Sequence, residues 1–136
     1  MRGNQAPEQP VPGRDKHASR RALVAFIAYW LALFTATHWP RPPELAAVVG
    51  SDKIAHLAGY AVLTFLLAQA VAPRHRRLSP ASYAAILAAV AGYGIVDELL
   101  QPLVGRYSEF WDWAADVAGA LVGLVCFRLR EYVRLR

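Results

Sequence analysis

The sequence has 136 residues, a length typical of a single domain, and 56% of them are hydrophobic. Water-soluble domains are usually about 45–50% apolar, and here the excess is gathered into four blocks separated by charged or proline-rich stretches. The net charge of +5 could indicate nucleic-acid binding, but Lys and Arg lie at the ends of the blocks and not along one helix face. Zinc-binding spacings, phosphate-binding loops and hydrolase motifs are absent from the sequence. The composition therefore favours a membrane protein over a nucleic-acid-binding domain.

The chain begins with a polar stretch, Met1 to Arg21, which contains three prolines and is predicted to be a disordered tail. The first apolar block follows at once and runs from Ala22 to Trp39, 18 residues that are just long enough to span a bilayer as a helix. A cleaved signal peptide is the alternative, but its positive region would be long and the Thr-Ala-Thr sequence at 35–37 is a poor cleavage site. We therefore interpret this block as a membrane span.

The second block follows a proline-rich stretch. Prolines at 40, 42 and 43 stop the first helix, because consecutive prolines cannot continue it. Glu44 to Val49 could form a short amphipathic piece. The second block itself runs from Ile54 to Ala72, with Ser51 and Asp52 supplying its N-cap and Pro73 ending it.

A basic turn at Arg74–Arg77 separates the second block from the third. Ser79-Pro80 is a typical helix start, and the third block then runs from Ala81 to about Leu100. Residues 106–111 form a link, and the fourth block runs from Trp111 to Phe127. It contains Cys126, the only cysteine, which excludes an intrachain disulfide and is expected to be buried as a small hydrophobe.

These blocks predict an all-α protein, a bundle of four transmembrane helices behind a disordered N-terminal tail. We divide the chain into a cytoplasmic tail at 1–21, a transmembrane domain at 22–128 and a basic cytoplasmic C-terminal tail at 129–136. A soluble helical bundle is the alternative. Its helices would need polar faces, and residues 22–37 and 54–72 offer almost none.

The distribution of charge predicts the orientation. Four spans put both termini on one side of the membrane, and that side, with the Arg74–Arg77 turn, holds 12 of the 15 Lys and Arg residues. The other side holds only Arg41, Lys53 and Arg106. The positive-inside rule therefore places both termini in the cytoplasm. Seven of the ten acids then lie at the outer ends of the helices.

Polar residues at the outer ends share helix faces. Asp52, His56 and Tyr60 are spaced four residues apart, so they lie on one face of the second helix. The same spacing recurs on the third and fourth helices. We expect these ends to form one polar cluster with a functional role, made of Asp52, Lys53, His56, Tyr60, Asp97, Glu98, Gln101, Arg106, Asp112 and Asp116.

Helix packing alone is the alternative explanation. Lys53 could simply pair with an acid, Asp52 could serve only as an N-cap, and His56 could be a hydrogen-bonded core residue. Several clustered acids, however, repel one another and cost stability, which favours a functional role. Gly119 and Gly123 form a GxxxG pattern on the fourth helix and predict close packing against another helix, within the chain or in a homodimer.

The polar residues also follow a recognisable pattern. It reads Asp52-Lys53-x-x-His56-x-x-x-Tyr60, then Asp97-Glu98-x-x-Gln101, then Gly105-Arg106-x-Ser108 with Asp112, Asp116, Gly119 and Gly123. Over Ser51 to Gly123 the chain thus resembles the VanZ-like family of small bacterial membrane proteins. The resemblance implies a multi-pass protein of the bacterial cytoplasmic (inner) membrane and cell envelope, in a family named for an association with glycopeptide resistance. It implies no settled reaction. Asp116 stands where such proteins usually carry Asn, which adds a charge to the cluster.

The function that we rank first is binding without catalysis. Lys53, His56 and Arg106 are cations suited to a phosphate or carboxylate, so the cluster is expected to bind an anionic envelope component, such as a lipid-linked cell-wall precursor. Nothing in the sequence requires a cofactor or predicts a nucleic-acid partner.

Two other functions rank lower. One is a metal-assisted membrane enzyme acting on a lipid head group, in which Asp97, Glu98 and Asp112 hold Mg²⁺, Ca²⁺ or Mn²⁺. His56 would then be the general acid or base. The other is a proton-coupled carrier of small solutes, in which the Asp97/Glu98 pair relays protons.

Overall fold

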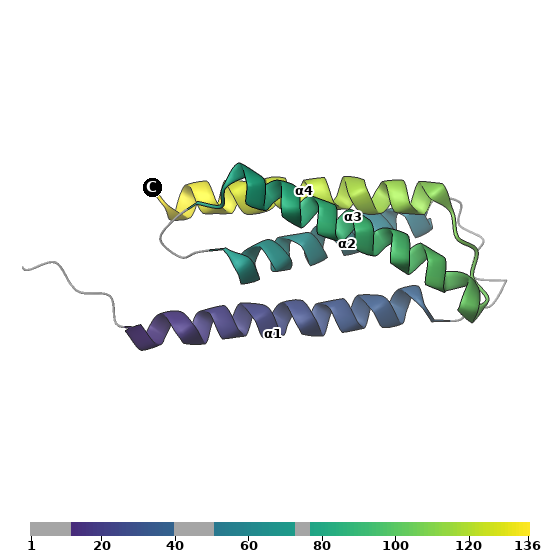
Figure 1. The fold of residues 1–136 in the computed structure, drawn as a ribbon, viewed down its shortest axis with the longest axis horizontal. Coiled ribbons are helices and arrows are strands. Elements are labelled where there is room, and N and C mark those ends of the chain that lie inside the picture. The colour runs from purple at the N-terminus through teal and green to yellow at the C-terminus, as the bar shows by residue number, and fades with distance from the viewer. Residues whose placement is uncertain (1–11, 40–50, 73–76) are drawn as a thin grey trace, which may run out of the picture.

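The computed structural model describes residues 12–39, 51–72 and 77–136, and this part of the chain is helical throughout its regular elements (Figure 1). The elements are α1 (Pro12–Thr37), α2 (Ser51–Val71), α3 (Pro80–Leu100), the 3-10 turn η2 (Gln101–Val104) and α4 (Phe110–Arg134). Within each α-helix lies a stretch long and apolar enough to cross a membrane, over Ser19–Thr37, Asp52–Val71, Pro80–Val104 (with η2) and Phe110–Arg134. The predicted all-α bundle with four spans is therefore confirmed.

The start of α1 corrects the predicted tail. α1 begins at Pro12 and not at Ala22, so residues 12–21 are helical instead of disordered. Proline suits the first turn of a helix because its missing N–H would have no intrahelical partner there. Arg20 and Arg21 are good helix formers, so a helix nucleated in the apolar block extends toward them at little cost. Residues 1–11 lie outside the described part of the chain, as does the expected amphipathic piece at 44–49.

The last helix is also longer than predicted, at its C-terminal end. α4 continues past Phe127 to Arg134, so most of the expected basic tail extends the last helix. The added residues contain no Gly or Pro, and Arg134 in the last turn is favoured by the negative end of the helix dipole. The start of α3 agrees with the start predicted from Ser79-Pro80. The Ser79 hydroxyl oxygen accepts a hydrogen bond from the Ser82 amide at 3.1 Å, and Pro80 follows this cap.

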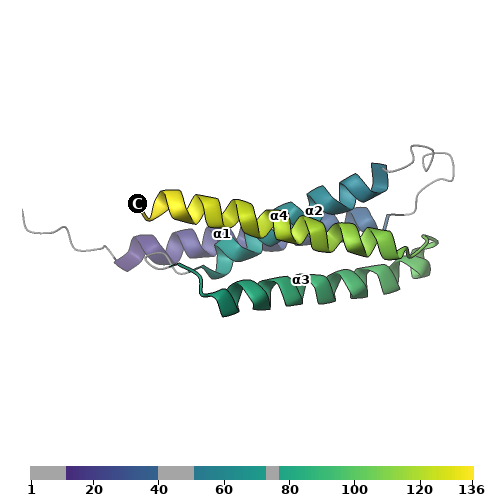
Figure 2. The same ribbon diagram turned by 90° about the horizontal axis from the view of Figure 1, so that it is seen from above.

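The tightest packing in the bundle is between α2 and α4, which cross each other (Figure 2). A Cβ atom on Gly119 would overlap the carbonyl oxygen of Leu57, and one on Gly123 would overlap that of Ala61. The two glycines therefore let the backbones approach, as the GxxxG pattern predicts. Because α2 occupies this face within the chain, the same face is not free for a homodimer. The homodimer itself stays a prediction.

The other two helices pack on this pair from different directions. α1 packs against α2, where the Tyr29 hydroxyl donates to the Gly59 carbonyl at 3.2 Å, and α3 packs mainly against α4. Only 6% of the apolar stretch of α1 is buried, so this helix is peripheral and presents most of its surface outward.

The burial pattern differs from that of a soluble protein. Large apolar side chains are exposed on the described faces of all four helices, for example Leu23, Val62, Ile95 and Val125. Among the residues that the structure describes, nine polar or charged ones are buried: Thr37, His56, Thr64, Asp97, Glu98, Gln101, Asp112, Asp116 and Glu131. A bilayer solvates the apolar exterior and drives polar groups inward, so this pattern agrees with membrane spans. Cys126 is exposed on the outer face of α4, which corrects the expectation that it is buried.

Candidate functional site

The polar residues predicted from the sequence gather at one end of the bundle, where α1 and α3 finish and α2 and α4 begin (right in Figure 1). We call this the acidic end. Seven of the ten predicted residues are buried there: His56, Tyr60, Asp97, Glu98, Gln101, Asp112 and Asp116. The other three, Asp52, Lys53 and Arg106, are half-buried.

A hydrogen-bonded pair between α2 and α4 lies at the centre of the acidic end. The Nδ1 atom of His56 is 2.9 Å from Oδ1 of Asp116, and the side chains are 3% and 0% exposed. The second oxygen of Asp116, Oδ2, is buried and has no hydrogen-bond partner among the described residues. A Cβ atom on Gly94 of α3 would lie 3.2 Å from this oxygen, so the glycine keeps the space beside it open.

Glu98 connects α3 to the start of α4. One carboxylate oxygen accepts a hydrogen bond from the Glu109 amide at 2.9 Å, and the other accepts a longer one from Gln101 Nε2 at 3.4 Å. Both Glu98 and Gln101 are buried. The helix spacing predicts the pairing of Glu98 with Gln101, whereas the bond to Glu109 depends on the link after η2.

Lys53 and Arg106, the two permanent cations in the described part of the acidic end, each contact acids of the chain. Lys53 Nζ donates to Glu109 at 2.9 Å and to Asp112 at 3.0 Å, so it bridges an exposed acid and a buried one. Arg106 Nη2 lies 3.4 Å from Asp52, while its Nη1 is buried without a partner among the described residues. Asp52 therefore does more than begin a helix, because it also holds the guanidinium of Arg106.

Asp97 faces a different set of neighbours. Its Oδ1 accepts hydrogen bonds from the Thr37 hydroxyl at 3.2 Å and the Tyr93 hydroxyl at 3.4 Å, and His38 Nδ1 lies 3.6 Å away. Thr37 and Tyr93 are not among the residues predicted for the cluster. Tyr93 stands four residues before Asp97, so the spacing of residues on one helix face could have predicted this contact. Thr37 carries no such signal, because its contact depends on how α1 packs.

The Tyr60 ring lies between those of His56 on α2 and Tyr93 on α3. It is parallel to that of His56, with centroids 6.5 Å apart, and to that of Tyr93 at 6.0 Å. The ring is fully buried, and its hydroxyl has no hydrogen-bond partner in the described part of the chain. The hydroxyl is therefore a polar group available to a ligand or to water inside the bundle.

Two groups of side chains among the described residues could hold a metal ion. They are His56 with Glu98 and Asp116, and His56 with Asp52 and Asp112, and in each group the ligand atoms lie within 4.8 Å of one another. The ligand set predicted from the sequence was Asp97, Glu98 and Asp112, but in the structure Glu98 belongs to the first group, Asp112 to the second and Asp97 to neither. His56, expected as an acid or base, belongs to both. The reason is the rotation of α3, which turns Asp97 toward α1 and Glu98 toward α4.

A pocket of about 320 Å³ opens beside Glu98. Its lining is mostly apolar and consists of Ile95, Glu98, Leu99, Ser108, Glu109, Phe110 and Trp113. Ile95, Leu99 and Phe110 are exposed, so the pocket joins the outer surface of the bundle to a buried carboxylate. An amphipathic molecule could reach Glu98 by this route.

The family model described as VanZ/LLP1 matches residues 14–131. The chain belongs to the VanZ/LLP1 family. No curated protein and no solved structure matches the chain. The family and the four apolar helices make the chain a VanZ-like multi-pass membrane protein, as the motifs predicted.

Proposed function

We propose that this VanZ-like membrane protein binds a divalent cation at its acidic end and, together with that cation, the anionic head group of an envelope component. One observation carries the proposal. His56, Glu98 and Asp116 converge from three helices, all three are buried, and the free oxygen of Asp116 faces no donor among the described residues. The ligand is identified by its chemistry, a phosphate or carboxylate on an amphipathic molecule.

The excess of acid favours the cation. The described part of the acidic end contains six acids, Asp52, Asp97, Glu98, Glu109, Asp112 and Asp116, against the two permanent cations Lys53 and Arg106. Buried carboxylates in a membrane protein are costly unless they are paired, and a divalent ion pairs two of them at once. One imidazole with two carboxylates suits Mn²⁺, Fe²⁺ or Zn²⁺ better than Ca²⁺, which prefers oxygen ligands alone.

The rim of the acidic end favours an anionic head group. Arg106 contributes a buried Nη1 that has no partner among the described residues, and Lys53 is 41% exposed at its side chain. Guanidinium and ammonium groups bind phosphate and carboxylate oxygens by charge-assisted hydrogen bonds. The pocket beside Glu98 adds an apolar wall, so a molecule with an acyl or polyprenyl chain fits better than a free ion.

The proposal includes an orientation. We place both termini in the cytoplasm and the acidic end at the outer face of a bacterial cytoplasmic membrane, and the distribution of Lys and Arg supports this orientation. A lipid-linked cell-wall precursor presents its phosphates and sugars at that face. If such a precursor is the ligand, loss of the protein changes the susceptibility of the cell to glycopeptides.

Metal analysis of the protein purified in mild detergent tests the cation. The parent should retain about one transition-metal ion per chain and be stabilised by added Mn²⁺ or Zn²⁺. Asp116→Asn and His56→Gln should each weaken the affinity for the metal at least about tenfold, and the added ion should then stabilise each variant less than the parent. Glu109→Gln is the matched control, since Glu109 is an exposed acid of the same end that belongs to neither metal group. A parent that holds no metal and is not stabilised by divalent ions would overturn the proposed cation site.

Lipid identification on the same preparations tests the head group. Arg106→Gln should lose a co-purified anionic lipid while the protein still inserts and keeps its metal. Unchanged lipid content in Arg106→Gln would overturn the anionic ligand and leave the metal proposal standing.

A metal-assisted enzyme is the second candidate, and one observation favours it. Asp116 holds the His56 imidazole at 2.9 Å, as a carboxylate orients a catalytic histidine. Release of a water-soluble head group from added lipid by the parent, lost in His56→Gln, would favour this candidate over binding alone.

A further inference from the structure

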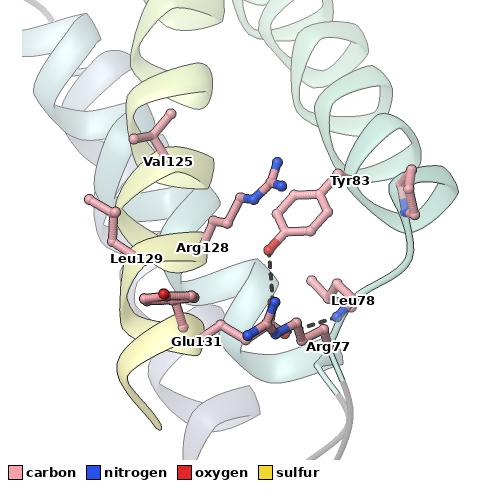
Figure 3. A pocket seen from close by; sticks show the side chains of 9 residues that line it. Arg77, Leu78, Tyr83, Val125, Arg128, Leu129 and Glu131 are labelled. Atoms are coloured by element: carbon pink, nitrogen blue, oxygen red, sulfur yellow. Dashed lines mark hydrogen bonds between the residues drawn. The ribbon is translucent and has the colours of Figure 1, made fainter. Parts of the chain in front are cut away.

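A second pocket lies at the opposite end of the bundle, which we call the basic end, where α3 begins and α4 finishes (Figure 3). Its volume is about 660 Å³, within the usual range for binding sites of small molecules. Its lining residues are Arg77, Leu78, Pro80, Tyr83, Val125, Arg128, Leu129, Glu131 and Tyr132. None of these residues takes part in the site at the acidic end.

Glu131 fixes the wall of this pocket. The carboxylate of Glu131 is buried and accepts hydrogen bonds from the Leu78 amide at 2.9 Å and from the Tyr83 hydroxyl at 3.1 Å. These bonds hold the first turn of α3 against the last turns of α4. Both oxygens of Glu131 are therefore engaged with donors of the chain, and the carboxylate stabilises the pocket's shape.

Two guanidinium groups extend into the pocket from opposite walls, Arg77 from the segment before α3 and Arg128 from α4 (Figure 3). Neither Arg77 nor Arg128 has an ion-pair partner within the described part of the chain. The Arg77 guanidinium carbon lies 5.4 Å from the centre of the Tyr132 ring, which holds this side chain over the pocket. The two cations together exceed the single charge of Glu131.

The remaining walls are apolar and continue onto the outer surface of α4. Val125 is 58% exposed and Leu129 is 62% exposed, so this part of α4 presents an apolar surface suited to acyl chains. Arg128 lies near the end of one candidate span and Arg77 lies just before another, which favours a position for both at the level of the polar head groups. The pocket thus has a cationic part at the interface and an apolar part toward the bilayer.

We infer that the pocket at the basic end binds a phospholipid with an anionic head group from the surrounding leaflet, with Arg77 and Arg128 contacting its phosphate. Guanidinium groups bind phosphate through paired hydrogen bonds, and basic pockets between membrane helices select anionic lipids. The apolar walls accommodate the upper part of the acyl chains. This site is independent of the metal and head-group site at the acidic end.

Lipid binding to the full-length protein, delipidated in a neutral detergent, tests the inference by native mass spectrometry. The probes are phosphatidylglycerol, phosphatidylcholine with the same acyl chains, and inorganic phosphate. The parent should prefer phosphatidylglycerol. Arg77→Gln and Arg128→Gln should each weaken its binding about fivefold, and the double variant about 25-fold. Arg130→Gln is the matched control, because Arg130 is an exposed arginine of the same turn region that does not line the pocket.

Three results would overturn the inference. They are equal binding of the two lipids by the parent, an equal loss of phosphatidylglycerol in Arg130→Gln, and binding of inorganic phosphate as tight as that of the lipid. The preference of the parent is measured without any substitution, so the test remains decisive even if the double variant does not fold. Metal content should be the same in all these variants, which separates this inference from the proposed function.

Discussion

His56 on α2 and Asp116 on α4 lie 2.9 Å apart in the interior of the bundle, with 3% and 0% of their side chains exposed. Asp116 stands about one and two helical turns before Gly119 and Gly123, where the backbone of α4 closely approaches that of α2 at Leu57 and Ala61. The close approach of α2 and α4 therefore brings an imidazole and a carboxylate into hydrogen-bond contact without water between them. Glu98 of α3 completes the group and makes this contact part of a three-helix site.

The His56–Asp116 pair predicts a non-additive effect on stability. His56→Leu leaves the Asp116 carboxylate buried without its partner and should destabilise the protein by about 3–5 kcal/mol, because an unpaired buried charge is costly. His56→Leu with Asp116→Leu removes both polar groups and should recover much of that loss. Thermal unfolding in detergent without added metal measures both variants. A double variant that is less stable than His56→Leu would contradict the coupling.

The contact between Thr37 and Asp97 predicts that one hydroxyl attaches the end of α1 to α3. Thr37→Val removes the donor and should cost about 1–3 kcal/mol, because Asp97 is buried and loses a partner. Thr35→Val is the matched control, since the Thr35 hydroxyl is exposed and bonds only to Leu31 of its own helix. Equal melting temperatures for the two variants would show that the contact does not hold α1.

The α2–α4 interface predicts different effects for three glycine substitutions. Gly119→Ala and Gly123→Ala each place a methyl group against backbone of α2 and should cost about 1–3 kcal/mol or more, because backbone cannot move aside as a side chain can. Gly92→Ala has nothing within 4 Å of the added Cβ and should leave stability unchanged or raise it. The three melting temperatures in one detergent compare them directly. Destabilisation by Gly92→Ala as large as by Gly123→Ala would argue against this interface.

The charge distribution predicts the sidedness of the chain. A reporter fused after Arg77 should be in the cytoplasm, and one fused after Arg106 should be outside, because Lys and Arg are concentrated on the side of both termini. Paired enzymatic reporters, one active only in the cytoplasm and one only outside it, measure this. If the Arg77 fusion is outside, the acidic end faces the cytoplasm and an extracytoplasmic ligand is excluded.

Much of the fold could be predicted because it depends on patterns along one chain. An apolar stretch long enough to cross a bilayer must form a helix there, since every backbone N–H and C=O has to be paired internally. Helix spacing likewise predicts that Glu98 lies near Gln101. The starts and ends were less predictable: α1 and α4 both extend beyond their apolar blocks, because neighbouring residues without Gly or Pro continue a helix already formed.

The sequence by itself determined the four apolar helices, the separation of basic from acidic ends, and the family motifs. Only the tertiary structure decided which side chains meet: Asp97 turns to Thr37, Glu98 joins His56 and Asp116, and Cys126 faces outward. The physical reason is that spacing along a helix relates residues of that helix alone. How each helix is rotated about its axis depends on packing, here on the approach of α4 to α2 through two glycines.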